Sequence, residues 1–190
     1  MLLFQLIRHG QSVANTGEKR PSDCGDHSIE LTSLGWKQAI EGGKKIGPEY
    51  LLSNCLTYCS PYTRTRQTLD GLLEGANVGR NDVHVREDPR LREVEFGYEE
   101  GASLEQQAFL QERIREKHGW FYYRFRGGES PADCFDRTSS FLESMMRQVV
   151  RKEAERVLIV THGRLAIRCF VTRFLHLSVE VFDSLDNPSN

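Results

Sequence analysis

Two short apolar segments of the chain each end in a histidine followed by a glycine. Leu2–Ile7 stops at Arg8-His9-Gly10, and Arg156–Thr161, which is rich in β-branched residues, stops at His162-Gly163. Apolar runs of this length and composition predict buried strands. Ligands of open α/β sheets bind outside the carboxyl ends of the strands, so both histidines lie where a functional site is expected.

The residues between these two strands alternate between helical and strand-like patterns. A helix capped by Thr32 is predicted to end at Gly47-Pro48, and Cys55–Cys59 reads as a strand. Ser60-Pro61 predicts the next helix, with Ser60 as N-cap, running to about Gly75. This alternation predicts an α/β fold, a three-layer α/β/α sandwich with a mainly parallel central sheet and helices on both faces.

The second half of the chain predicts a charged helix at the surface and a long helix that packs on the core. Val83–Val85 is a brief strand candidate, and Ser103 opens a capping box for a charged helix to about His118. Ser130-Pro131 predicts the start of a long helix with an apolar face. We expect one domain spanning residues 1–190, with residues of about 98–128 forming a helical and aromatic lid insertion.

Charge and composition narrow the class of protein. The 190 residues contain 25 Lys and Arg against 27 Asp and Glu, a net charge of −2, which argues against a nucleic-acid partner. The apolar runs are too short to cross a bilayer, and the N-terminal segment lacks the basic region of a signal peptide, so we expect a cytoplasmic protein without a membrane partner. Five widely spaced cysteines predict reduced thiols, with a zinc site at Cys55 and Cys59 as a weak alternative.

Arginines add positive charge to the expected site. Arg8 directly precedes His9, and Arg64 lies in the first turn of the predicted second helix. A guanidinium group binds two phosphate oxygens at once and keeps its charge at any biological pH. Gly10 and Gly163 have no side chain that would block an anion from the backbone N–H groups. The residues alone therefore favour a phosphoryl group over a neutral ligand.

Five sequence blocks resemble those of one known family. They are Leu6-Ile7-Arg8-His9-Gly10-Gln11-Ser12 with Asn15; Leu31-Thr32 with Gly35 and Gln38-Ala39; Ser60-Pro61-x-x-Arg64-x-x-Gln67-Thr68; Leu91-x-Glu93-x-x-Phe96-Gly97; and Val160-Thr161-His162-Gly163. Their order and content are similar to those of the histidine phosphatase superfamily, the phosphoglycerate mutase-like enzymes. Gly128-Glu129-Ser130 fits the turn before the family's long helix, and the aromatic run 121–125 looks most like a little-characterised branch.

The resemblance implies a role for each matching residue. His9 would be the nucleophile that carries the phosphoryl group, with a backbone carbonyl near Gly10 fixing its tautomer, and Glu93 would be the proton donor. Arg8, Arg64 and a protonated His162 would supply positive charge to the phosphoryl oxygens. Ser12 and Asn15 are expected to bind the phosphate or to orient Arg8. Thr16 and Gly17 are expected to add a backbone contact with the phosphate, and Gly163 is a further phosphate-binding candidate. No metal and no cofactor is expected.

The family contains mutases as well as phosphatases. The segment between Glu93 and Gly128 lacks the adjacent Arg-Arg pair with which glycolytic mutases grip the sugar acid, so hydrolysis of a phosphomonoester is favoured over mutase-type transfer. A non-catalytic adaptor that binds a phosphorylated ligand is the third alternative. The expected partners are a phosphorylated small molecule, or a phosphorylated protein, and inorganic phosphate as product, while the sequence carries no signal of oligomeric state.

The aromatic segment and the C-terminal segment each leave two interpretations open. Aromatic residues 120–125 are expected to pack in the core or lid, with an aromatic wall for the substrate as the alternative. Family members usually continue past an Asn-x-Ser into a last strand, whereas the printed sequence ends at Asn187–Asn190, so the resemblance leaves this edge of the sheet open.

Overall fold

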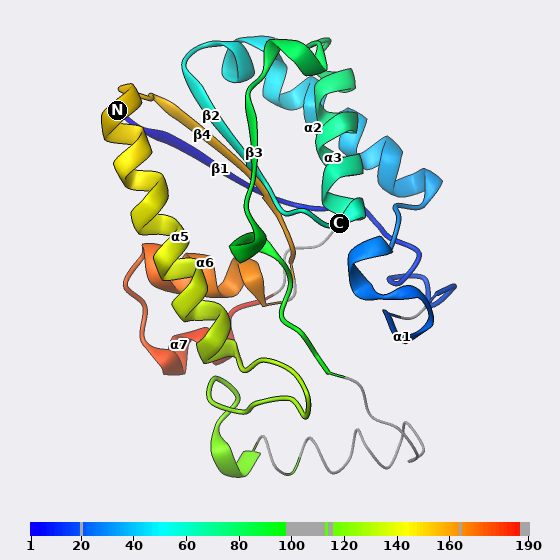
Figure 1. Cartoon of the computed structure of the whole chain (residues 1–190), viewed down its shortest axis with the longest axis vertical. Coiled ribbons are helices and arrows are strands. Elements are labelled where there is room, and N and C mark those ends of the chain that lie inside the picture. The colour runs from blue at the N-terminus through cyan, green and yellow to red at the C-terminus, as the bar shows by residue number, and fades with distance from the viewer. Residues whose placement is uncertain (20, 98–112, 114–115, 164, 187–190) are drawn as a thin grey trace.

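The computed structural model describes residues 1–19, 21–97, 113, 116–163 and 165–186, and its centre is a parallel sheet (Figure 1). The strands are β1 (Leu3–Arg8), β2 (Cys55–Cys59), β3 (Val85–Glu87) and β4 (Arg156–Thr161), in the order β1-β4-β2-β3, and every pairing among them is parallel. The helices are α1 (Pro21–Cys24), α2 (Ser33–Leu52), α3 (Thr63–Gly75), α5 (Pro131–Lys152), α6 (Ala166–Phe174) and α7 (Val179–Ser184), with 3-10 turns at Asp26–Ser28, Arg80–Asp82 and Pro89–Leu91.

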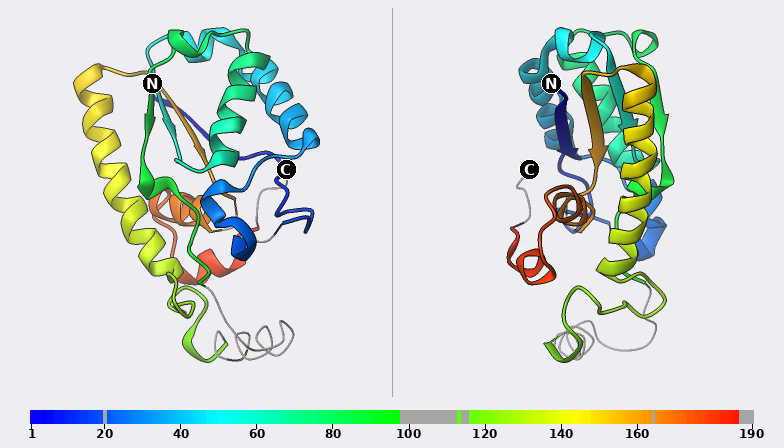
Figure 2. Two further views of the ribbon diagram at one scale, coloured as in Figure 1. Left: turned by 45° about the vertical axis from the view of Figure 1, so that its right-hand side comes forward. Right: turned by 90° about the vertical axis from the view of Figure 1, so that its left-hand side faces the viewer.

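Helices cover both faces of the sheet, as the alternating pattern predicts, and Figure 2 shows the sheet between the two helical layers. Successive β4 residues point to opposite faces because side chains alternate along a strand. Leu158 and Val160 pack against α2 and α3, while Val157 and Ile159 pack against α5 and α6. The fold prediction is therefore confirmed, whereas the single-domain organisation stays a prediction.

Two predicted helix ends differ from the observed ones. Gly47 has a non-helical φ of 74° that interrupts α2, but the chain resumes a helical course at Pro48 and continues to Leu52, because proline fits the first turn of a helix. The second helix begins at Thr63 with Tyr62 as N-cap, so Ser60 does not cap it. The Ser60 side chain bonds His162 instead, and an interaction with a partner 102 residues away is invisible to local pattern analysis.

The remaining predictions fall on the second half of the chain. β3 covers Val85–Glu87, two residues later than predicted, because Val83 is buried in the core before the pairing with β2 begins. The long helix begins as predicted, with Ser130 as N-cap. Most of the helix predicted from Ser103 lies outside the described residues, as does most of the predicted lid.

Three residues of the aromatic run within the predicted lid belong to the core. Phe121, Tyr123 and Phe125 are buried in one cluster with Val94 and Phe182. In Figure 1 this segment lies below the sheet, near α7. These three rings therefore pack in the core and do not form the aromatic wall for a substrate that was the alternative.

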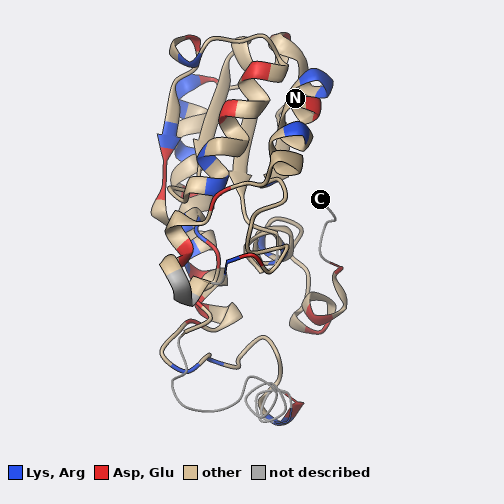
Figure 3. Ribbon diagram, turned by 90° about the vertical axis from the view of Figure 1, so that its right-hand side faces the viewer, with Lys and Arg blue, Asp and Glu red and all other residues tan. Residues whose placement is uncertain are grey.

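Charged residues of both signs are interspersed over the ribbon (Figure 3). This distribution agrees with the near-neutral net charge. No described helix combines the length and the apolar character that crossing a bilayer requires.

The loop after β1 packs directly on the start of α2, and this contact requires glycine at position 35. A Cβ atom there would lie 2.1 Å from the carbonyl oxygen of Gln11. We expect Gly35→Ala to lower the free energy of unfolding by roughly 1–3 kcal/mol, because the backbone must move apart. Urea denaturation measures this loss.

Gly42→Ala in the same helix is the matched control. A Cβ there would meet only the end of the Leu72 side chain, at 3.0 Å, which can move away. Equal destabilisation by the two substitutions would contradict the packing argument for Gly35.

Candidate active site

The two histidines lie together at the carboxyl ends of neighbouring strands. β1 pairs directly with β4, and the backbone N–H of His9 continues the ladder by donating to Thr161 O at 3.0 Å. The ring centroids of His9 and His162 are 5.3 Å apart, and the exposed fractions of the two residues are 5% and 0%. The sheet therefore brings together residues that are far apart in sequence.

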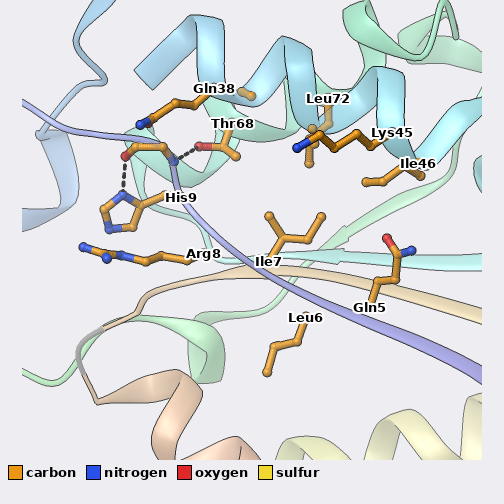
Figure 4. Close-up of a pocket in the computed structure, with 13 residues that line it drawn as sticks. Gln5, Leu6, Ile7, Arg8, His9, Gln38, Lys45, Ile46, Thr68 and Leu72 are labelled. Carbon is orange, nitrogen blue, oxygen red and sulfur yellow. Dashed lines mark hydrogen bonds between the residues drawn. The ribbon is translucent and has the colours of Figure 1, made fainter. Parts of the chain in front are cut away.

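His9 is held in one tautomer by the backbone. Its Nδ1 donates to the carbonyl oxygen of Gly10 at 2.7 Å, in the region that the family resemblance implies, so that Nε2 carries the lone pair. Gly10 in turn donates its N–H to Thr68 Oγ1 at 3.0 Å, and both bonds are drawn in Figure 4. Burial and the charges of Arg64 and Arg8 lower the pKa of His9 to about 3, so the ring is neutral at biological pH.

Arg64 faces the free nitrogen of His9. Its Nε donates to His9 Nε2 at 3.3 Å, and its guanidinium carbon lies 5.1 Å from the centre of the Tyr62 ring. Arg64 lies in the first turn of α3 and is 5% exposed. Asp26 holds the other end of the guanidinium through a salt bridge of 3.0 Å.

Arg8 runs alongside Gly163, at the turn after β4. A Cβ atom at Gly163 would lie 2.2 Å from Cδ of Arg8, so the glycine gives the arginine side chain its path. Figure 4 shows the Arg8 and His9 side chains next to each other. Burial lowers the pKa of Arg8 and the charge of Glu93 raises it, but an arginine stays protonated throughout the biological range.

His162 differs from the sequence expectation in its charge. Its Nε2 is 2.8 Å from Ser60 Oγ, and its Nδ1 is buried without a hydrogen-bond partner among the described residues. Burial, Arg64 and His9 all lower its pKa well below the usual value, so His162 is neutral here, not protonated. The two arginines therefore supply the positive charge beside His9, and His162 contributes a polar nitrogen.

Glu93 is fixed at the start of α6. Its Oε1 accepts hydrogen bonds from the backbone N–H groups of Val94, Leu165 and Ala166, at 2.9, 3.2 and 3.1 Å. The side chain is 6% exposed. These three hydrogen bonds hold the Glu93 side chain in one orientation.

A buried ion pair holds the loop that carries Glu93. Arg137 donates to the backbone oxygens of Arg90, Arg92 and Glu93 at 2.6, 2.9 and 3.1 Å. Glu129 accepts from Arg137 in bidentate fashion and also pairs with Arg92. These contacts give Arg137 a supporting role for the loop that carries Glu93.

The loop after β1 contains the remaining candidates. Asn15 Oδ1 accepts from the backbone N–H of Ser12 at 3.0 Å and from its hydroxyl at 3.1 Å, so these two side chains shape the loop. The Thr16 hydroxyl is exposed and donates to Val13 O, while Gly17 has a φ of 79°. Their contacts with a phosphate stay predictions.

A cavity of about 450 Å³ opens between β1 and the helices α2 and α3 (Figure 4). Arg8, His9 and Gly10 line part of it, and the other lining residues are a mixture of apolar and polar side chains from β1, α2 and α3. The cavity reaches Arg8 and His9, whereas Arg64, Glu93 and His162 do not line it.

The cysteines form neither disulfides nor a metal site in the described part of the chain. All five cysteines are free. Among the described residues, no group of three or more His, Cys, Asp or Glu side chains is arranged to hold a metal ion. This holds for Cys55 and Cys59 as well. Burial raises the pKa of the Cys59 thiol to about 12, which makes it unreactive.

The buried His9 ring should make the protein less stable in acid. The folded state keeps His9 neutral down to about pH 3, whereas the unfolded chain binds a proton near pH 6.5, so acid favours unfolding. Across that window we expect His9 to account for a loss of roughly 3–5 kcal/mol in the free energy of unfolding. Urea denaturation between pH 7 and pH 4 measures the slope, and His9→Gln should flatten it. An unchanged slope would contradict the assignment.

A sequence model of one family matches almost the whole chain. The family is described as the histidine phosphatase superfamily (branch 1), and the match covers residues 4–190.

Individual relatives are similar over the same range. Phosphoglycerate mutase-like protein AT74 of Arabidopsis thaliana is 37% identical over 202 residues, which are 97% of this chain and 61% of that protein. This chain thus spans less than two thirds of AT74. Broad-range acid phosphatase DET1 of Saccharomyces cerevisiae is 25% identical over 99% of this chain and 83% of its own length.

Solved structures have the same fold. The structure of a mycobacterial glucosyl-3-phosphoglycerate phosphatase in complex with VO3 superposes with a TM-score of 0.75 and 26% sequence identity. The superposition covers 97% of this chain and 87% of that one.

Proposed function

Since the chain belongs to branch 1 of the histidine phosphatase superfamily, we propose that it hydrolyses a phosphomonoester through a phosphohistidine on His9. The observation that carries the proposal is the state of the His9 ring. Its Nδ1–H is fixed on Gly10 O, its Nε2 lone pair faces Arg64, and its pKa of about 3 leaves it neutral. A neutral, oriented imidazole beside fixed positive charge is what in-line attack on phosphorus requires.

The first step transfers the phosphoryl group to the protein. Nε2 of His9 forms a bond to phosphorus while the bond from phosphorus to the ester oxygen breaks, and protonated Glu93 gives its proton to that oxygen. Arg8 and Arg64 stabilise the charge on the equatorial oxygens, and the buried Nδ1 of His162 is available to a third oxygen when it carries the proton.

The second step returns the site to its starting state. Water attacks phosphorus, the Glu93 carboxylate takes the water proton, and the bond between phosphorus and Nε2 breaks. Inorganic phosphate leaves, Glu93 is again protonated, and His9 is again neutral. This cycle uses two arginine side chains for the charge that a metal ion supplies in other phosphatases.

Hydrolysis is preferred to mutase-type transfer. The lack of an adjacent Arg-Arg pair between Glu93 and Gly128 argues against a grip on a phosphorylated sugar acid. The similarity to an acid phosphatase and to a phosphatase of a phosphorylated sugar derivative supports a small phosphorylated molecule as substrate.

Phosphate release from a panel of phosphomonoesters, measured from about pH 5 to 8 with EDTA present, tests the proposal. We expect release that survives EDTA, is inhibited by orthovanadate and passes through an acid-labile, base-stable phosphoprotein. Phosphate transfer to a second phosphoglycerate without net release would indicate the mutase, and binding of phosphate without turnover would indicate the adaptor.

A further inference from the structure

The arginine that faces His9 is held at its other end by a carboxylate that no sequence block contains. Asp26 lies in the 3-10 turn Asp26–Ser28, and Arg64 lies in the first turn of α3. Arg64 Nη1 is 3.0 Å from Asp26 Oδ1, Nη2 donates to Oδ2 at 3.1 Å, and Nη1 also donates to the backbone oxygen of Asp26 at 2.6 Å. The exposed fractions of the two side chains are 6% and 18%.

These contacts divide the guanidinium into two edges. Asp26 occupies the end edge, formed by Nη1 and Nη2. The side edge, formed by Nε and the second N–H of Nη2, is directed at His9, since Nε donates to its Nε2. A guanidinium binds two oxygens best through one such edge, because its two N–H groups are parallel.

The turn that presents Asp26 is itself anchored. Ile29 is 1% exposed and donates its backbone N–H to Asp26 O at 3.4 Å, and Ser28 donates its backbone N–H to Gly25 O at 3.1 Å. The carboxylate therefore approaches Arg64 from a fixed segment of backbone, with both oxygens used by a single guanidinium.

We propose that Asp26 is a positioning residue for phosphoryl binding, which holds Arg64 by one edge so that the opposite edge receives two phosphoryl oxygens next to His9. This inference rests on the proposed function, in which Arg64 binds those oxygens. In this arrangement Arg64 keeps its position when the phosphoryl group binds. The Nε–H of Arg64, which donates to His9 Nε2 in the free protein, donates to a phosphoryl oxygen instead. The lone pair of His9 Nε2 is then available for attack on phosphorus.

A second role for Asp26 makes the opposite prediction. A carboxylate that merely neutralises Arg64 would weaken phosphate binding, so that its removal would tighten it. A positioning residue strengthens binding by keeping the guanidinium oriented, and its removal weakens it. The sign of the change in phosphate affinity separates the two roles.

The test measures the affinity for inorganic phosphate by titration calorimetry, which needs no turnover. We expect Asp26→Asn to weaken phosphate binding about tenfold and to lower kcat on 4-nitrophenyl phosphate. The matched control is Glu87→Gln, which removes the carboxylate that binds Arg66 on the same helix at 2.8 and 2.6 Å but at the surface. Phosphate affinity equal to or tighter than that of the wild type in Asp26→Asn would overturn the proposal.

A double-mutant cycle keeps the proposal testable if Asp26→Asn is unstable. If Asp26 acts through Arg64, adding Asp26→Ala to Arg64→Ala should leave phosphate affinity unchanged. A further loss in the double variant would overturn the proposal. If the wild type binds phosphate but hydrolyses no ester, the proposed phosphatase activity is contradicted, while the role of Asp26 can still be tested by phosphate affinity. If the wild type does not bind phosphate, both proposals are overturned.

Discussion

Replacing His9 with alanine should lower kcat for phosphomonoester hydrolysis by at least about 10³-fold, because no other described side chain presents a neutral, oriented nitrogen to the same point. His9 Nε2 is oriented by the bond from Nδ1 to Gly10 O and by burial at 5% exposure. Water at the vacated position would have neither this orientation nor the nucleophilicity of an imidazole. The variant should still bind inorganic phosphate, since Arg8 and Arg64 remain.

The measurement combines steady-state kinetics with detection of the phosphoprotein after a base quench. Wild type should yield a phosphohistidine and His9→Ala none. His84→Ala is the control, because His84 is exposed and far along the chain from both strand ends. Phosphate release at an undiminished rate by His9→Ala would exclude the phosphohistidine cycle.

Replacing Glu93 with glutamine should lower kcat by roughly 10²–10⁴-fold for esters of alkyl alcohols and much less for 4-nitrophenyl phosphate. Glutamine can keep the hydrogen bonds from the backbone of Val94, Leu165 and Ala166, since its amide oxygen also accepts, but it cannot give a proton to the leaving oxygen. An alkoxide needs that proton when it leaves, whereas 4-nitrophenolate is stable without it. The loss should therefore grow with the basicity of the leaving group.

Kinetics on a series of esters with leaving groups of different basicity check this prediction. Glu95→Gln changes a carboxylate two residues further along the same loop and is expected to leave the dependence unchanged. An equal loss for all esters would show that Glu93 acts on binding or on the loop, and the proton donor would have to be sought elsewhere.

Different residues hold Glu93 and the arginine of the phosphate site in place. Arg137 and Glu129 hold the loop that carries Glu93, while Asp26 holds Arg64. In the proposed cycle the first group sets the position of the proton and the second sets the position of the phosphoryl oxygens. Defects in the first should depend on the leaving group, and defects in the second should appear in phosphate affinity.

Much of the fold follows from local sequence pattern. The segments Leu2–Ile7, Cys55–Cys59 and Arg156–Thr161 are recognisable as strands because short, β-branched apolar runs have few other ways to bury their side chains. The helix after Ser130 is recognisable because a capping box and proline mark its start. Parallel pairing predicts that His9 and His162 lie at the same edge of the sheet, whereas their contact depends on the strand order, which places β4 next to β1.

Other features were decided by contacts between distant segments. Ser60 looks like a helix cap in sequence, yet it lies beside His162 and the helix begins three residues later. The lowered pKa of His162 could not be expected from the sequence, because a sequence does not reveal complete burial next to an arginine.

The sequence by itself determined the sheet, the two histidines at its carboxyl edge and the presence of arginines near them, because periodicity, capping and strand termination are local properties. Only the tertiary structure decided which groups hold these side chains. Asp26 pairs with Arg64 across 38 residues and Glu93 with α6 across 72. Such pairs depend on the path of the intervening chain, and neither the spacing nor the type of the residues encodes that path.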